Sequence, residues 1–166
     1  MKFIDPHHDQ WHSAAGEDGP RPAPRPREHS LLTLEQWHAV RGHWPTALQH
    51  VGVILPNDHE VEVLQPDLGR LTLVVLQFPK WTDGRAYSQA RVLRARLGFT
   101  GEIRATGEVL VDMLPLLQRT GFDAVQLRAD QRLESAQRAL RFFAGHYQGD
   151  TVEPRPVFQR GAVAGA

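Results

Sequence analysis

Residues 71–78 constrain the fold more than any other stretch of the chain. Their sequence, LTLVVLQF, is apolar at nearly every position. A half-exposed strand alternates apolar and polar residues, whereas a strand buried on both faces is apolar throughout, as in a parallel sheet covered by helices. The run therefore predicts a central strand of a parallel sheet.

Further strands and helices alternate around this run. Short β-rich runs predict three more strands, at residues 51–55, 102–105 and 122–128. Apolar residues at helical spacing predict helices over residues 83–97, over 107–120 and from residue 130 onward. Alternating strands and helices favour βαβ units. We therefore expect an α/β fold with a small, mostly parallel sheet of about four strands and crossover helices, either an open sheet or a partial barrel.

Local signals refine these boundaries. Thr33 and Gln36 have the spacing of a capping box, which predicts a short helix to about residue 41. Pro115 lies inside the helix expected over residues 107–120, so that helix should kink or break there, and Gly121 should end it. Residues 59–67 fit a strand or a short helix equally well.

Proline and arginine dominate the stretch before the predicted domain. Residues 19–27, GPRPAPRPR, disfavour helix and sheet and favour extended polyproline conformations. The chain is again rich in proline and glycine from residue 149. We expect a disordered tail over residues 1–29, one α/β domain over 30–148 and a flexible tail over 149–166.

Composition excludes several classes of protein. The chain has no cysteine, so it can form no disulfide, thiol nucleophile or cysteine-bound iron–sulfur cluster. Its 19 basic and 19 acidic side chains balance, which argues against a nucleic-acid partner. No run approaches the roughly 20 apolar residues that a membrane span needs. We therefore expect a cytoplasmic protein with no membrane partner.

The turn after residue 78 carries the densest set of polar side chains. Lys80, Asp83, Arg85, Tyr87 and Ser88 fall within nine residues. Turns that follow parallel strands meet at one edge of the sheet, where open α/β folds bind ligands. The helix predicted to begin near this turn would direct free backbone N–H groups towards an anion.

Two arginines at other strand ends extend this candidate site. Arg104 and Arg128 belong to the strands predicted over residues 102–105 and 122–128, and arginine binds phosphate, sulfate and carboxylate groups in a bidentate manner. The predicted ligand-binding set is Lys80, Asp83, Arg85, Tyr87, Arg104 and Arg128, with a small oxyanion or a phosphorylated compound as ligand. Two alternatives stay open. The two arginines could instead form structural ion pairs with Glu102, Asp123 or Asp130, and Asp83 could simply cap a helix.

No motif names a reaction. The sequence lacks the Gly-x-Ser-x-Gly, Gly-x-Gly-x-x-Gly, Walker and His-Glu-x-x-His patterns. The histidines at positions 7, 8 and 12 read as part of a solvated segment, so no metal site is predicted. Catalytic residues, cofactor and enzymatic status all stay open.

Four ordered motifs carry a resemblance to a known family. They are residues 52–58 (GVILPND), 78–88 (FPKWTDGRAYS), 101–107 (GEIRATG) and 121–124 (GFDA). Together they resemble a bacterial family of unknown function, commonly described as an oxidoreductase involved in sulfite reduction. The resemblance covers about residues 50–147. The chain departs from the pattern at Trp81, where phenylalanine is usual, and at Ala86, where glycine is usual.

The resemblance implies a role in sulfur assimilation, because members of this family are typically encoded beside assimilatory sulfite reductase. The catalytic subunit of that enzyme carries sirohaem and a cysteine-bound cluster, which a chain without cysteine cannot hold. Two interpretations follow. In the first, the protein is an accessory factor that docks on sulfite reductase or another sulfur-assimilation protein. In the second, it is a small enzyme or sensor that binds an oxyanion or sulfur metabolite at its basic strand ends.

Overall fold

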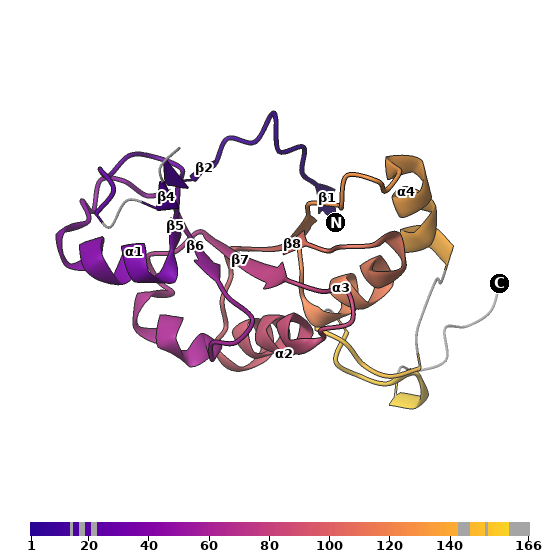
Figure 1. The fold of residues 1–166 in the computed structure, drawn as a ribbon. Coiled ribbons are helices and arrows are strands. Elements are labelled where there is room, and N and C mark those ends of the chain that lie inside the picture. The colour runs from indigo at the N-terminus through magenta and orange to yellow at the C-terminus, as the bar shows by residue number, and fades with distance from the viewer. Residues whose placement is uncertain (14, 17–18, 21–22, 143–146, 152, 160–166) are drawn as a thin grey trace.

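A single parallel sheet organises the molecule. The computed structural model describes residues 1–13, 15–16, 19–20, 23–142, 147–151 and 153–159. Seven parallel strands lie in the order β1-β9-β8-β7-β6-β5-β2, and the sheet curls into an open half-barrel with helices along it (Figure 1). The predicted α/β class is confirmed, although the sheet is larger than the four strands expected.

The strands of the sheet are β1 (Lys2–Phe3), β2 (His12–Ser13), β5 (Ser30–Thr33), β6 (Val51–Leu55), β7 (Leu73–Phe78), β8 (Glu102–Gly107) and β9 (Ala124–Val125). A separate antiparallel pair consists of β3 (Ala15–Gly16) and β4 (Gly19–Pro20). The α-helices are α1 (Leu34–Val40), α2 (Arg85–Arg91), α3 (Leu114–Thr120) and α4 (Leu133–Phe142). Short 3-10 helices cover Arg41–His43, Val61–Asp67, Val111–Met113 and Val157–Gln159, and a π-helical segment, Val92–Arg96, extends α2.

Several local signals formed as predicted. At the start of α1, the Gln36 backbone N–H donates to Thr33 Oγ1 at 3.2 Å, and the Thr33 N–H donates to Gln36 Oε1 at 2.8 Å, which is the reciprocal capping box. Gly121 ends α3 with φ of 105°, in the left-handed region that glycine adopts without strain. The ambiguous residues 59–67 contain the 3-10 helix Val61–Asp67 rather than a strand.

The helix expected over residues 107–120 is shorter, and the cause is local. Gly107 is the last residue of β8, where φ is 95° and an added Cβ would lie 2.5 Å from the Phe78 carbonyl oxygen. The strand therefore runs on to a position that only glycine fits. Helix α3 begins at Leu114, so Pro115 lies in the first turn, where its missing N–H costs no hydrogen bond.

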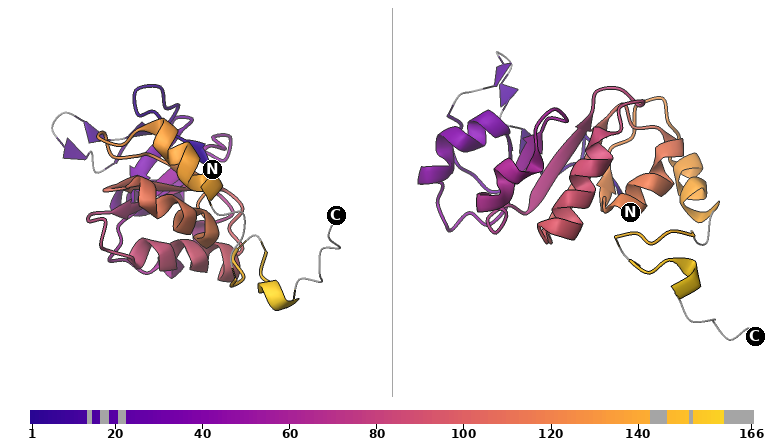
Figure 2. Two further views of the ribbon diagram at one scale, coloured as in Figure 1. Left: turned by 90° about the vertical axis from the view of Figure 1, so that its right-hand side faces the viewer. Right: turned by 90° about the horizontal axis from the view of Figure 1, so that it is seen from below.

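The face of the sheet towards α2 and α3 holds the apolar core. These helices lie together along one side of the sheet (Figure 2). Every second residue of β7 and β8 points into this layer and is almost fully buried: Val74, Leu76, Phe78, Ile103 and Ala105. The helices contribute Ala86, Ala90, Leu93, Leu114 and Leu117, all with no exposed surface. Helices α2 and α3 thus cover one face of β7, the strand predicted from the continuous apolar run.

The opposite face is covered by residues 1–13, here called the N-terminal strap. β1 pairs with β9 at one edge of the sheet and β2 pairs with β5 at the other, and the intervening segment arches across the sheet between them (Figure 1). The Trp11 ring lies over Gly52, where an added Cβ would be 3.1 Å from it. Leu73 and Val75 are only 0% and 2% exposed on this face.

The strap differs from the disordered tail expected over residues 1–29. Strands of two residues show no periodicity in a sequence, so nothing in the pattern indicated β1 or β2. The domain boundaries near residues 30 and 148 stay predictions. Residues 14, 17–18, 21–22, 152 and 160–166 of the two expected tails lie outside the described residues. Along the described part of the chain, no helix has the length and apolar character to cross a membrane.

Candidate functional site

The turns after β6, β7 and β8 lie side by side at one edge of the sheet. Leu55 pairs with Leu76, and Phe78 pairs with Gly107, so the three strands end close together. This register places the turn at residues 79–84 beside Asn57, which follows β6. The predicted gathering of polar side chains at the carboxyl ends of the strands is therefore real for this turn.

Asp83 and Arg85 form the centre of this edge. Arg85 Nη2 donates to Asp83 Oδ2 at 2.7 Å, and the Asn57 side-chain amide donates to the same oxygen at 2.8 Å. The hydrogen bond from Arg85 holds the pKa of Asp83 well below its ordinary value. Gly84, and not Asp83, is the N-cap residue of α2, and no side chain caps the helix. Asp83 thus orients Arg85 across the turn.

Lys80, on the turn, and Tyr87, on helix α2, differ in exposure. Lys80 is exposed, and its ammonium group has no ion-pair partner among the residues that the structure describes. The neighbouring Trp81 side chain is also exposed, at 58%. Tyr87 is half-buried, with its ring edge-on to Phe78 at a centroid distance of 5.1 Å, and burial raises the pKa of its phenol. Lys80 and Trp81 are thus exposed neighbours on this turn.

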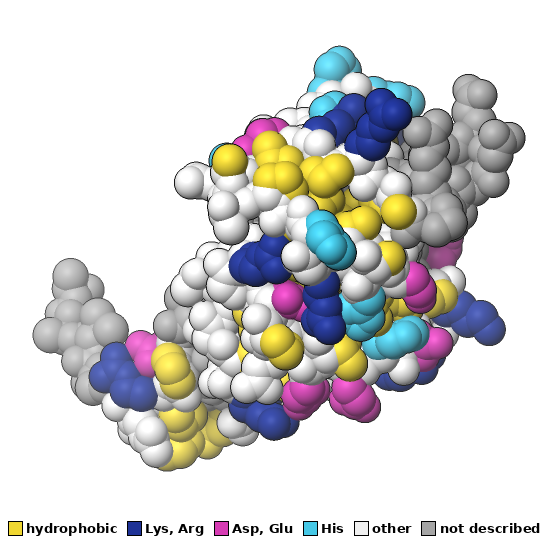
Figure 3. Space-filling view, turned by 90° about the vertical axis from the view of Figure 1, so that its left-hand side faces the viewer, with side chains coloured by type: hydrophobic (Ala, Val, Ile, Leu, Met, Phe, Trp, Pro, Cys, Tyr) yellow, Lys and Arg dark blue, Asp and Glu magenta, His cyan; other side chains and the backbone are white. Residues whose placement is uncertain are grey.

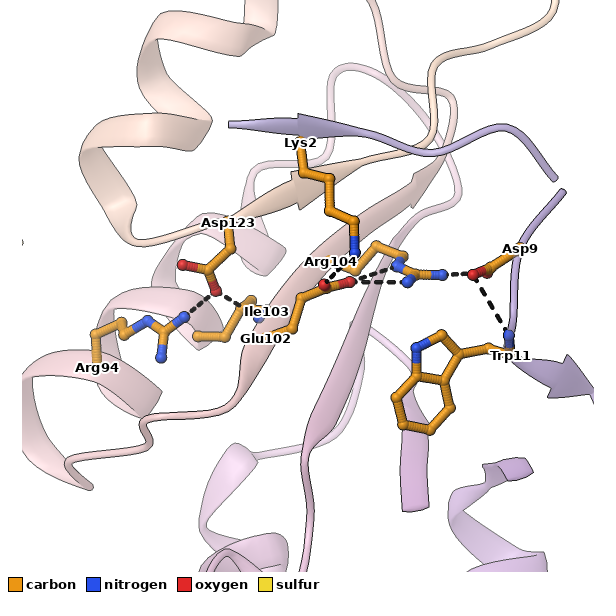
Figure 4. A network of polar contacts seen from close by, with 8 residues as sticks. All are labelled: Lys2, Asp9, Trp11, Arg94, Glu102, Ile103, Arg104 and Asp123. Carbon is orange, nitrogen blue, oxygen red and sulfur yellow. Dashed lines mark hydrogen bonds and ion pairs between the residues drawn. The ribbon is translucent and has the colours of Figure 1, made fainter. Parts of the chain in front are cut away.

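Arg104 lies away from the edge. It is the third residue of β8, opposite Val75 in the ladder, and its side chain is 3% exposed on the face under the strap. Its Nε and Nη2 donate to Glu102 Oε1 at 2.9 and 2.8 Å, and its Nη1 pairs with Asp9 of the strap (Figure 4). Lys2 completes the network, with its Nζ 3.2 Å from Glu102 Oε2. Arg104 thus forms the structural ion pair with Glu102 that the sequence offered as an alternative to ligand binding.

Asp123 belongs to a neighbouring set of contacts. It pairs with Arg94, and its Oδ2 accepts the Ile103 backbone N–H at 2.8 Å (Figure 4). It therefore pairs with neither of the two arginines for which it was a candidate partner.

Arg128 is also occupied by carboxylates. Its Nε and Nη2 donate to the two oxygens of Asp130 at 2.7 Å each, and its Nη1 donates to Glu108 Oε2 at 2.8 Å. This arrangement lowers the pKa of Asp130 to about 2 and raises the pKa of Arg128. Arg128 lines a pocket of about 250 Å³ with Ile4 and Asp5 of the strap.

A second pocket, of about 270 Å³, lies between the residues that follow β6 and helix α2. Its polar lining consists of Asn57, Asp58, His59, Glu60, Arg85, Ser88 and Gln89. Gln89 is 7% exposed, and its Nε2 donates to the carbonyl oxygens of Pro56 and His59 at 3.0 and 2.7 Å. Its Oε1 is buried without a hydrogen-bond partner. Sequence reasoning missed Gln89, although a glutamine between the apolar helix positions 86, 90 and 93 was a visible signal.

The six predicted ligand-binding residues therefore occupy three places. Asp83 and Arg85 meet at the edge, with Lys80 on the same turn and Tyr87 on α2. Arg104 is buried under the strap, and Arg128 lies in its own ion-pair cluster. Whether they bind a ligand stays a prediction. Asp9, the partner of Arg104, was not foreseen because 95 residues separate the two.

Comparison with known families places the chain. Residues 52–158 match the model of the family described as "Bacterial protein of unknown function (DUF934)". The chain belongs to this family. Membership confirms the part of the resemblance that concerned a bacterial family of unknown function. The matched residues include β7, β8, β9 and the turn at residues 79–84, whereas the strap and β5 precede them. The chain matches no curated protein.

Proposed function

We propose that this protein is an accessory factor of assimilatory sulfite reduction that docks on the reductase machinery through the turn at residues 79–84. The observation that supports docking most strongly is the contrast within the predicted cationic edge. Arg85, Arg104 and Arg128 are each paired with carboxylates, whereas Lys80 and Trp81 are exposed on the turn that precedes Arg85. The turn thus offers an exposed aromatic ring next to an exposed ammonium group.

An exposed tryptophan on a short turn suits a protein partner better than a small anion. Tryptophan is enriched among the residues that dominate the binding free energy of protein interfaces. The Asp83–Arg85–Asn57 hydrogen bonds hold the turn in one conformation, which lowers the entropy lost on binding. The complementary surface would offer an apolar pocket for Trp81 and an acidic group for Lys80.

The link to sulfite reduction rests on the resemblance carried by the four motifs, and growth tests it directly. Deletion of the coding sequence should impair growth on sulfate and on sulfite, and sulfide should restore growth because it enters after the reductive step. Normal growth of the deletion strain on all three sulfur sources would remove the assignment to sulfite reduction.

Docking is tested by binding of the purified chain to purified sulfite reductase. Trp81→Ala should weaken binding about 30-fold or more, as expected for loss of about 2 kcal/mol at a central aromatic residue. Trp81→Phe, the residue usual in the resembling family, should retain most of the affinity. Leu116→Ala is a matched control, because Leu116 is an exposed apolar residue on α3. Equal affinities of the wild type and Trp81→Ala would rule out this docking surface.

The pocket beside α2 supports a second candidate function, as a sensor or small enzyme acting on a sulfur metabolite. Arg85 lines this pocket and could bind an anionic group there. The acidic Asp58 and Glu60 make the pocket fit a ligand with both a positive and a negative group better than a bare oxyanion.

A thermal-shift series distinguishes this candidate. Sulfite, sulfate and adenylyl phosphosulfate would be compared on the wild type, on Arg85→Gln and on Arg128→Gln. A ligand at 100 times its Kd stabilises the native state by about 2.7 kcal/mol, which is easily measured. A shift abolished by Arg85→Gln and kept by Arg128→Gln would place the ligand in the pocket beside α2. No shift with any of these compounds, or with cysteine and homocysteine as zwitterionic probes, would exclude it.

A further inference from the structure

Three metal-ligating side chains meet at the amino edge of the sheet, the end opposite the candidate site. β5 begins at Ser30 and β6 at Val51, and these two residues are partners in the ladder. The residues just before them therefore lie next to each other. Glu28, His29 and His50 each offer one ligand atom, and these atoms all lie within 4.8 Å of one another. Histidine side chains are prominent on the side of the molecule that carries α1 (Figure 3).

The backbone holds this cluster in place. The His29 N–H donates to the His50 carbonyl oxygen at 2.9 Å, which continues the β5–β6 pairing by one residue. Glu28 accepts the backbone N–H groups of Gln49 at 3.1 Å and of His50 at 3.0 Å. The strap adds a third segment, because the His12 N–H donates to the His29 carbonyl oxygen at 2.8 Å.

The side chains are already in contact. His50 Nδ1 lies 3.1 Å from Glu28 Oε2, and the His29 and His50 rings stack at 4.6 Å with an interplanar angle of 9°. Glu28 offers a carboxylate oxygen, and the two histidines offer imidazole nitrogens.

His29 has a positive φ, which is uncommon for residues other than glycine. Its φ is 56°, and it is the only non-glycine residue with positive φ among those that the structure describes. Such strain tends to be kept at sites where the side chain has a use.

We propose that Glu28, His29 and His50 bind a divalent first-row transition metal ion, with Zn²⁺ the best match. Two imidazole nitrogens and one carboxylate oxygen suit Zn²⁺, whereas Mg²⁺ and Ca²⁺ prefer all-oxygen sites. Ligand atoms of a tetrahedral zinc lie about 3.4 Å apart, given bonds of about 2.0–2.1 Å. Binding therefore adjusts the spacing of the three groups and rotates one imidazole out of the stack, because a metal lies in the plane of each ring it binds. Water takes the fourth position.

Such a site would fasten the strap to the sheet. The Trp11 ring is edge-on to His29 at 5.4 Å, and His12 is bonded to the His29 backbone. An ion held by His29 and His50 thus stabilises the end of the strap that carries β2. This role is separate from docking or ligand binding at the carboxyl edge, so either proposal can fail without the other.

The proposal is tested by titrating the metal-free full-length chain with ZnCl2 in a calorimeter, and with Co²⁺ while following visible absorption. The wild type should bind one equivalent at this site. His29→Gly, His50→Gln and Glu28→Gln should each lower the affinity at least tenfold. His29→Gly should keep the fold without metal, because glycine adopts the positive φ freely, and its Tm should no longer rise with Zn²⁺.

The matched control replaces two exposed histidines of the strap, His7→Ala/His8→Ala. Affinity at this site should survive in the control. Three results would overturn the proposal: no zinc binding by the wild type, wild-type affinity in His29→Gly and His50→Gln, or a loss in the strap control as large as in those variants.

Discussion

The two faces of the sheet are buried in different ways. Towards α2 and α3, residues such as Leu76 and Ile103 form an all-apolar layer with no exposed surface. Towards the strap, Leu73 and Val75 share the face with Arg104, a charged side chain that is 3% exposed. The helix face is stabilised mainly by the hydrophobic effect, whereas the strap face also depends on an ion-pair network that must stay complete. Substitutions should therefore act on the two faces through different physical terms.

The largest effect is expected on the helix face. Leu76→Ala removes a fully buried side chain from the centre of the apolar layer. It should lower the free energy of unfolding by about 2–5 kcal/mol, through lost transfer energy and the cavity left behind. Chemical denaturation followed by circular dichroism measures this. A cost below about 1 kcal/mol would mean that this face is loosely packed, and the contrast between the faces would disappear.

On the strap face, Asp9→Ala should lower the free energy of unfolding by about 2 kcal/mol. The substitution leaves Glu102 as the one carboxylate paired with the buried Arg104 among these partners. The companion Asp9→Ala/Arg104→Met removes the uncompensated charge as well, so it should be more stable than Asp9→Ala. Denaturation of both variants gives the comparison. Asp112→Ala, at an exposed aspartate, is the control and should be near neutral. A double variant less stable than Asp9→Ala would contradict the electrostatic account.

A smaller effect is expected where the strap touches β6. Gly52→Ala would place a Cβ 3.1 Å from the Trp11 ring and equally close to Leu31 and Leu73. The resulting crowding should cost about 1 kcal/mol and raise hydrogen exchange in residues 1–13. Exchange measured by mass spectrometry on peptides from the strap and from β7 separates the two regions. Equal increases in both would show that the strap does not open independently.

The smallest effect on stability is expected at the rim, where the groups of the Arg128 cluster are largely in solvent. The pKa of Asp130 is about 2 in the folded protein, below the ordinary value of about 3.9 for an aspartate. Because the pKa of Asp130 is lower in the folded than in the unfolded chain, its carboxylate stabilises the fold at any pH above the unfolded-state pKa. This contribution is lost as the pH falls from about 4 to about 2. In Arg128→Gln the carboxyl group should titrate close to its ordinary pKa, as followed by NMR. An unchanged midpoint would show that Arg128 is not the cause.

Sequence patterns predicted the parts of this fold whose signals are local. The apolar run of β7, the runs of β6, β8 and β9, the Thr33–Gln36 capping box and the Gly121 helix end all depend on neighbouring residues. The strap could not be foreseen, because β1 and β2 are two residues long and their partners lie far along the chain.

The candidate site likewise contains features that local patterns predicted and features that depend on residues far apart in the sequence. The turn carrying Asp83 and Arg85 was located correctly, because strand order alone determines which turns share an edge. Arg104 was expected at that edge because the strand was predicted to end at residue 105, two residues short of Gly107. The cluster of Glu28, His29 and His50 had an unused signal, since residues that precede neighbouring parallel strands meet just as those that follow them do.

The pairing of Lys2–Phe3 with Ala124–Val125 has a consequence for synthesis on the ribosome. About 120 residues must be added after β1 before its partner strand exists. At about 5–20 residues per second this takes about 6–25 s, without counting the further length hidden in the exit tunnel. During that interval β1 has no partner strand, and the sheet face beneath it stays open. The earliest-translated residues of this fold are thus among the last to reach their native position.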